Sequence, residues 1–184
     1  MALSKVDAVN FLTGTIPSGN IATSSLAAAA TGKVLQVVSA TKTDIFSTTS
    51  TSYVDITDLT VDITPSATSS KILVMFTTTV GCDLATVFMA LRLVRDSTAI
   101  AIGDSASNRV QATGGVGRAN DVSDTYSING QYLDSPSTTS ATTYKVQAAN
   151  SNSNNTRINS NGLNADNAQT GRYASTITVM EIGA

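Results

Sequence analysis

The stretch Ser69-Ser70-Lys71-Ile72-Leu73-Val74-Met75-Phe76-Thr77-Thr78-Thr79-Val80 is the longest run of strand-forming residues in the chain. Successive side chains of a strand point to opposite faces, so Ile72, Val74 and Phe76 would share one face. Leu73 and Met75 would then lie on the other. A strand that is apolar on both faces has to be covered on both. We therefore expect a central strand with a second sheet over one face, and a subunit interface or another layer of the same domain over the other.

The composition favours strands over helices. The chain has 184 residues, of which 13% are charged, about half the ordinary share. Residues that strands prefer, such as Thr, Val, Ile and Tyr, fill the places that Glu and Lys usually take, and Glu181 is the single glutamate. The lone Cys82 excludes an internal disulfide, which fits synthesis in a reducing cytosol. We expect neither a secretory signal nor a membrane-spanning helix, since no apolar run is long enough.

Short strand-like segments follow one another, separated by turn residues about every ten positions. Asp58, Asp96 and Asp134 are placed at turns, because Asp hydrogen-bonds its own backbone there. Two polar loops are expected at 103–121 and 161–171. The pattern predicts an all-β fold, an antiparallel β-sandwich that is jelly-roll-like, over residues 32–184. The expected strands are 33–40, 44–46, 53–56, 59–64, 69–80, 85–95, 99–102, 125–133, 142–148, 156–160 and 173–182.

The first 31 residues differ from the rest of the chain. Gly and Pro interrupt the segment, and it has too few apolar residues to form a core of its own. We interpret residues 1–31 as a short N-terminal arm that anchors the chain to a partner or a neighbouring subunit. An arm folded back on its own domain remains the alternative. The predicted anchor residues are Val6, Val9, Phe11, Leu12, Ile16 and Ile21.

The residue types argue against catalysis. The sequence contains no histidine, which removes Ser-His-Asp and Cys-His mechanisms and the usual zinc sites. Glycoside hydrolases need paired carboxylates, and the aspartates stand mostly at turns. Glu181 is expected to be buried at an interface beside an arginine, as a paired charge. We therefore expect no enzyme activity, no metal and no cofactor.

Charge excludes some partners and leaves one candidate binding region. The net charge is −2, and the eleven Lys and Arg are scattered, so we expect neither nucleic acid binding nor membrane insertion. Amide and guanidinium groups in two loops suit sugar hydroxyls, although the aromatic residue usual in a sugar site is missing from both loops. Plain solvated loops are the alternative. The candidate receptor or glycan residues are Asn108, Arg109, Arg118, Asn152, Asn154, Asn155 and Arg157.

Four segments, taken in order, resemble a domain of tail-fibre-like and other virion structural proteins of tailed bacteriophages, especially marine ones. They are Gly32 to Val38, Phe46 to Met75, Tyr132 through Gln147, and Ile177 to Ile182. The resemblance covers about residues 32–184, and Leu12 to Pro17 is similar to segments that precede such domains. Two departures are the lack of coiled-coil, collagen or shaft repeats and the presence of Asp58 where a glycine is expected.

The resemblance implies a jelly-roll-like domain, often trimeric, that is made in the host cytoplasm and displayed on the virion. We expect a homo-oligomer in which leftover apolar strand faces are buried between copies, while the arm contacts other virion proteins. A fibre or tail-tip module that contacts the host and a capsid decoration or cement protein both fit. The rival of another class is a carbohydrate-binding adhesin module.

Overall fold

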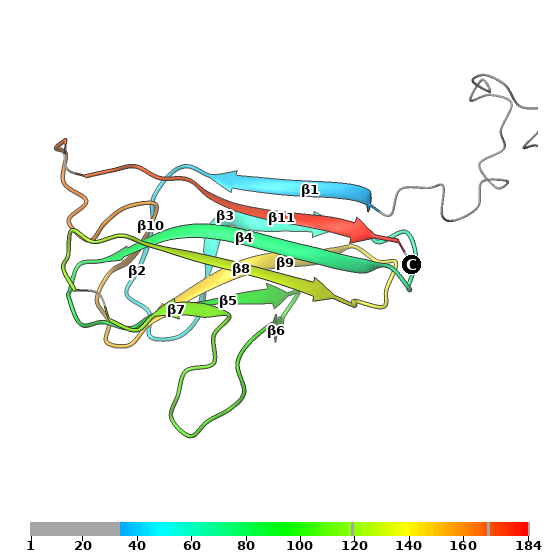
Figure 1. Ribbon diagram of the computed structural model, residues 1–184, viewed down its shortest axis with the longest axis horizontal. Helices are drawn as coiled ribbons and strands as arrows, with labels where there is room; N and C mark the ends of the chain where they lie inside the picture. Colours follow the sequence, from blue (N-terminus) through cyan, green and yellow to red (C-terminus); the bar gives the residue numbers. More distant parts are fainter. Residues whose placement is uncertain (1–33, 119, 169, 184) are drawn as a thin grey trace, which may run out of the picture. The chain divides into compact units, whose positions relative to one another are not determined.

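The computed structural model describes residues 34–118, 120–168 and 170–183, which form two antiparallel β-sheets (Figure 1). The predicted anchor residues of the arm lie outside these residues. Sheet A contains β1 (Val34–Lys42), β2 (Phe46–Thr48), β4 (Lys71–Cys82), β8 (Tyr126–Asp134), β10 (Thr156–Ile158) and β11 (Ser175–Ile182). Sheet B contains β3 (Val54–Ile63), β5 (Met89–Arg95), β6 (Thr98–Ile100), β7 (Gly114–Val116) and β9 (Thr142–Asn150).

The strand order is that of a jelly roll. On one side of β4, β11 pairs with its first part and β10 with its last part, so β10 and β11 act as one interrupted strand. β2 and β1 lie outside them in the same way, and β7 and β6 share one side of β5. The strands of sheet A therefore follow the order β1/β2, β10/β11, β4, β8, and those of sheet B follow the order β3, β9, β5, β6/β7. The chain crosses repeatedly between them, which confirms the predicted jelly-roll-like sandwich.

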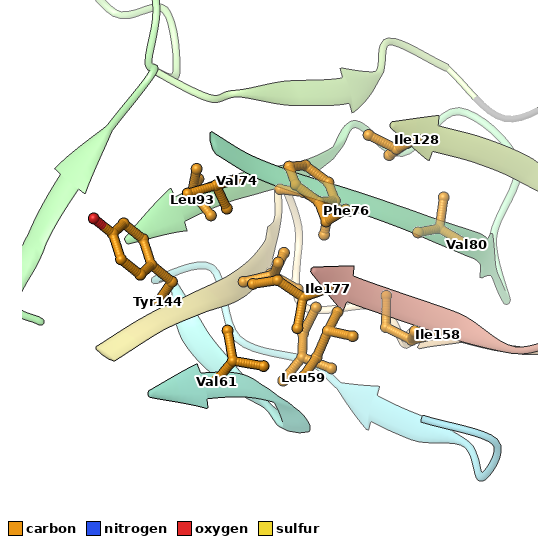
Figure 2. Packing of buried hydrophobic residues seen from close by; sticks show 14 of the residues in the cluster. Leu59, Val61, Val74, Phe76, Val80, Leu93, Ile128, Tyr144, Ile158 and Ile177 are labelled. Atoms are coloured by element: carbon orange, nitrogen blue, oxygen red, sulfur yellow. The ribbon is translucent and has the colours of Figure 1, made fainter. Parts of the chain in front are cut away.

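The apolar core lies between the sheets. Ile72, Val74 and Phe76 of β4 are buried there, as their shared parity predicts. Figure 2 shows Val74 close to Leu93 of sheet B, with Tyr144 nearby. Full burial of one such side chain is worth about 1.5–3 kcal/mol, so this one face of β4 contributes a substantial part of the stability of the fold.

Asp58 lies in a bulge and not in a turn between two strands, so the prediction of separate strands at 53–56 and 59–64 was wrong. β3 is one strand, and its register against β9 shifts between Asp55 and Thr60. Asp58 has a φ of 63°, the left-handed backbone that Asp tolerates better than most residues. The Lys42 ammonium lies 3.8 Å from the Asp58 carboxylate and 2.7 Å from that of Asp44.

The region around β5 and β7 also differs from the prediction. The strand expected from residue 85 begins only at Met89, after Thr86, whose φ is 82°. The expected loop 103–121 contains β7, which pairs with the beginning of β5. A Cβ on Gly115 would lie 2.6 Å from the carbonyl oxygen of Met89, so this close approach requires glycine. Glycine is rare in strands, which explains why the sequence pattern indicated a loop.

Asp134 ends β8 and joins the two sheets, so its predicted place in a turn was wrong. It is 4% exposed. Its carboxylate accepts hydrogen bonds of 2.9 and 2.8 Å from Nη1 of Arg95 and one of 2.6 Å from the Tyr144 hydroxyl. Burial raises the pKa of Tyr144, and its hydrogen bond to Asp134 raises it further. The network ties β8 of sheet A to β5 and β9 of sheet B.

Glu181 is buried beside neutral groups, and the arginine expected next to it is not there. The residue is 1% exposed, and none of the ion pairs among the described residues includes it. Its carboxylate accepts hydrogen bonds of 2.7 and 2.6 Å from the backbone N–H and hydroxyl of Ser66, and one of 2.7 Å from the Gln36 amide. Burial alone would raise its pKa, but these donors outweigh burial and lower the pKa to about 2.

Candidate assembly surface

The side of sheet A that faces away from sheet B carries an apolar row across four strands. Backbone pairing places Val37 of β1 beside Met180 of β11, Met180 beside Leu73 of β4, and Leu73 beside Leu133 of β8. Val37 is 54% exposed and Leu133 48% exposed, while Met180 and Leu73 are half-buried by their neighbours. We call this set the apolar row. Leu73 thus lies on the second apolar face that the sequence of β4 predicted.

Two further rows continue the same face, and neither contains a charged side chain. They are Ser39, Thr178, Met75 and Gln131, then Thr41, Thr176, Thr77 and Asn129. The hydroxyls of Ser39 and Thr178 share a hydrogen bond of 2.9 Å across the strands. We call the three rows together the outer face of sheet A. On the same side of the sheet, the next charged residue is Lys71, at the beginning of β4 and two residues before Leu73.

The corresponding side of sheet B is polar and carries charged side chains. The Asp55 carboxylate accepts hydrogen bonds from Lys145 at 2.8 Å and from Gln147 at 2.6 Å, and both donors hold its pKa below the usual range. Nε of Arg92 donates to Gln147 at 2.7 Å, and the Arg92 guanidinium lies 4.1 Å from the centre of the Tyr53 ring. This side is a typical solvated face, and the contrast with the outer face of sheet A is one of charge.

The outer face of sheet A has the area of a small contact surface. Four strands spaced about 4.8 Å apart and three rows spaced about 7 Å apart give a plan area of about 400 Å². The apolar row makes up about a third of this area, and the depletion of charged side chains over the whole face is typical of interface cores. A depression of about 420 Å³ lies between the two polar rows, lined by Met75, Phe76, Thr77, Asn129, Gly130 and Gln131. The face therefore has both a projecting apolar row and a hollow for a partner's side chain.

The first predicted receptor loop is exposed. Asn108 and Arg109 lie in the β6–β7 connection, and Arg118 follows β7. An aromatic side chain from outside the loop reaches it, since the Tyr53 hydroxyl donates to the carbonyl oxygen of Gln111 at 2.8 Å. Sequence spacing gave no sign of this contact, because Tyr53 is 58 residues away.

The second predicted receptor loop is held largely by its own contacts. Asn155 donates its backbone N–H and its amide to Asp83 at 2.9 and 2.6 Å. Nη1 of Arg157 donates to the carbonyl oxygen of Gly162, and Asn154 donates to the Asn152 side chain at 2.6 Å. Arg157 and Asn155 are partly buried. They support the β9–β10 connection, and among the described residues the two predicted loops share no hydrogen bond or ion pair.

Sequence reasoning identified the face through Leu73 and Met75 but missed the other residues of the apolar row. The missing signal was parity in the flanking strands, where Val37 shares a face with Ser39 and Leu133 shares one with Gln131. Within the described residues, no three potential metal ligands gather at one place. No helix with the length and hydropathy to cross a bilayer occurs in that part of the chain either.

The described part of the chain is a jelly-roll domain. Neither a protein-family model nor a curated protein matches the chain. Similar solved structures include that of infectious bursal disease virus Gx strain, at 13% identity and a TM-score of 0.42, covering 81% of this chain and 37% of that chain.

The Gt strain structure has 13% identity and a TM-score of 0.43, covering 81% of this chain and 38% of that chain. The crystal structure of the infectious bursal disease virus VP2 subviral particle has 14% identity and a TM-score of 0.37, covering 81% of this chain and 37% of that chain. This chain thus spans less than two-fifths of each of those chains. Likeness at this level carries no inference about what this chain does.

Proposed function

We propose that this protein is a structural component of a virus particle, and that contacts made through the outer face of sheet A hold its jelly-roll domain there. The observation that carries the proposal is the contrast between the two sheet faces. One face holds the charged side chains of Asp55, Lys145 and Arg92, and the other holds three rows without a charged side chain. Jelly rolls recur in viral capsid domains and lectins, and an uncharged face favours the first of these uses.

Assembly through this face would rest on apolar burial and not on ion pairs. Covering the exposed part of the four side chains of the apolar row is worth about 1 kcal/mol each, or about 4 kcal/mol per copy. The hydroxyl and amide groups of the two polar rows would exchange water for partners across the interface, at little net gain. Several contacts per particle are therefore needed for a stable shell or fibre, which multiple copies provide.

The finer parts of the proposal follow the resemblance to tail-fibre-like proteins of tailed bacteriophages. The chain would form a homo-oligomer of three copies, made in the host cytoplasm and incorporated into the virion through residues 1–31. The exposed β6–β7 loop, with Asn108 and Arg109, would face outward and contact the host in a fibre or tail-tip module. In a decoration protein, the same domain would clamp capsid subunits instead.

The carbohydrate-binding alternative has less support from the geometry. A sugar ring stacks on an open aromatic face, and Tyr53 is an aromatic residue that contacts the exposed loop beside Asn108 and Arg109. One face of its ring is already covered by the guanidinium of Arg92 at 4.1 Å. Asn155 and Arg157 are likewise engaged by Asp83 and Gly162. A glycan array probed with the full chain would give hits only if these contacts yield to a sugar.

The proposal is tested by placing a charge on the uncharged face. The purified full chain is expected to sediment as an oligomer at micromolar concentration. Leu73→Lys places an ammonium group in the middle of the interface, where an unpaired buried charge costs several kcal/mol. The dissociation constant of the oligomer should therefore rise at least 100-fold. Thr98→Lys, on an exposed position of β6 in sheet B, is the matched control and should sediment like the original chain.

Particles give the second readout. Deleting residues 2–31 should leave an oligomer that no longer enters particles, and low-resolution imaging of labelled particles should locate the domain at the tail or on the capsid. An original chain that sediments as a stable monomer, together with normal incorporation of Leu73→Lys into particles, would contradict the proposal.

A further inference from the structure

Two Asn-Gly pairs occur in the sequence, Asn129-Gly130 and Asn161-Gly162. Asparagine is one of the chemically labile residues of proteins. It is most labile before glycine, because the backbone nitrogen of a glycine reaches the side-chain carbonyl carbon of the asparagine with no Cβ in the way and with a freely turning backbone. The structure places the two pairs in opposite surroundings, so we expect them to react at different rates.

Asn129 and Gly130 lie in β8, at an edge of sheet A. β8 pairs with β4 alone among the described strands, and a strand held on one side opens locally more readily than a central one. The Asn129 side chain is exposed on the outer face and makes no hydrogen bond within the described part of the chain. Both residues line the depression of about 420 Å³, so water reaches this peptide group and there is space above it.

Asn161 and Gly162 are held in place by their surroundings. Asn161 is 2% exposed. Its amide nitrogen donates to the carbonyl oxygen of Ser123 at 3.4 Å, and its side-chain oxygen accepts a hydrogen bond of 3.0 Å from the backbone N–H of Asn164. A Cβ on Gly162 would overlap the carbonyl oxygen of Cys82, so this backbone lies against the end of β4 and has no room to turn. The second pair is therefore protected by packing.

We propose that Asn129 is a site of spontaneous modification, at which the side-chain amide is lost as ammonia and the outer face of sheet A gains a carboxylate. The backbone nitrogen of Gly130 gives up its proton and forms a bond to Cγ of Asn129. The Cγ–Nδ2 bond breaks, and its electron pair leaves with the nitrogen, which takes the proton and departs as ammonia.

Water completes the reaction by opening the cyclic imide. Cleavage of the imide bond to Cγ gives aspartate, and cleavage of the bond to the main-chain carbonyl carbon gives isoaspartate. One water molecule is consumed for each ammonia released, and no oxidant or reductant takes part.

Either product changes the polar row of Thr41, Thr176, Thr77 and Asn129, which has no charged side chain. Aspartate adds a negative charge to the face, and isoaspartate also adds a carbon to the main chain of β8 and disturbs its register with β4. The consequence for assembly rests on the proposed function. Contacts made through this face would weaken irreversibly as the protein ages, since an unpaired charge is costly to bury.

The test compares the two pairs in one sample of the full chain. The chain is incubated in a mildly alkaline buffer, once folded and once unfolded in urea, and is then digested with trypsin at mildly acidic pH. The two pairs fall on separate peptides, since Arg118 and Lys145 bracket the first pair and Arg157 and Arg172 bracket the second. Mass spectrometry with fragmentation follows the exchange of amide for carboxyl at each asparagine.

In the folded chain, Asn129 should react at least about tenfold faster than Asn161, whereas in urea the two rates should be similar because packing is lost. Asn129→Gln is the matched variant, since its longer side chain closes an imide far less readily, and its peptide should stay unmodified at this position. Equal rates in the folded chain, a faster Asn161, or an Asn129 that reacts in urea but not when folded would overturn the proposal.

The effect on assembly is measured separately by sedimentation. Asn129→Asp should raise the dissociation constant of the oligomer at least about tenfold, while Asn129→Gln and the sheet B control Thr98→Asp should leave it unchanged. An Asn129→Asp variant that assembles like the original chain would refute the consequence for assembly. A monomeric original chain would remove the proposed function, and the rates at Asn129 and Asn161 would still decide the modification.

Discussion

Acidification should remove the contribution that the buried, ionised Glu181 makes to the unfolding free energy. The pKa of this carboxyl is lowered from its ordinary value of 4.5 to about 2. A lowered pKa in the folded state means that the contribution is fully present above about pH 4.5 and is lost as pH falls through about 2. At about 1.4 kcal/mol for each pH unit, the difference corresponds to about 3 kcal/mol of unfolding free energy.

Glu181→Gln should remove this component. The amide that replaces one carboxylate oxygen presents N–H groups toward Ser66 and Gln36, which already donate there, so the free energy of unfolding near pH 7 should fall by about 3 kcal/mol. Between pH 4.5 and 2, the difference between variant and original chain should shrink toward zero. Gln36→Ala removes one of the donors to this carboxylate and should show a smaller part of the same effect.

Urea unfolding at fixed protein concentration, from pH 2 to 7, measures these differences. The subtraction of variant from original chain is essential because Asp44, Asp55 and Asp121 also have lowered pKa values. A Glu181→Gln variant whose stability parallels that of the original chain across this pH range would refute the reasoning. So would a variant as stable as the original chain at pH 7.

Two more substitutions probe contacts inside the sandwich. Tyr144→Phe removes one hydrogen bond to a buried carboxylate and should lower the unfolding free energy by about 1.5–3 kcal/mol. Asp134→Ala leaves Arg95 without its partner and should lower the unfolding free energy by about 3–5 kcal/mol. Thermal unfolding measures which variant is less stable, and a less stable Tyr144→Phe would contradict the role of the network. Gly130→Ala places a methyl group against the ring of Phe76 and should destabilise by about 1–3 kcal/mol, while Gly103→Ala, with open space around it, should change little in the same measurement.

The fold was predictable where local pattern and burial agree. The run around Leu73 and Met75 carries apolar side chains on both faces of the strand, and this alone indicates a central strand whose two faces are both covered. The structure places that strand in the middle of sheet A, with one side in the core and the other on the outer face. Strand alternation likewise predicted most of the elements and the sandwich class.

The misses share one physical cause, which is that a distant segment decides the local structure. Gly115 belongs to a strand because its backbone passes close to Met89. Asp134 is buried because Arg95 and Tyr144 reach it from the other sheet. Glu181 ionises without a cation because a turn at Ser66 directs donors at it. None of these partners lies within ten residues along the chain except Tyr144, so no short window reveals them.

The absence of charge from the three rows of sheet A has a consequence for how such an assembly responds to its surroundings. Salt screens interactions between ions, and contacts without ions escape that screening. Apolar contacts weaken on cooling instead, because the hydrophobic driving force fades at low temperature. A particle joined through this face would therefore withstand concentrated brine and would come apart most readily in the cold.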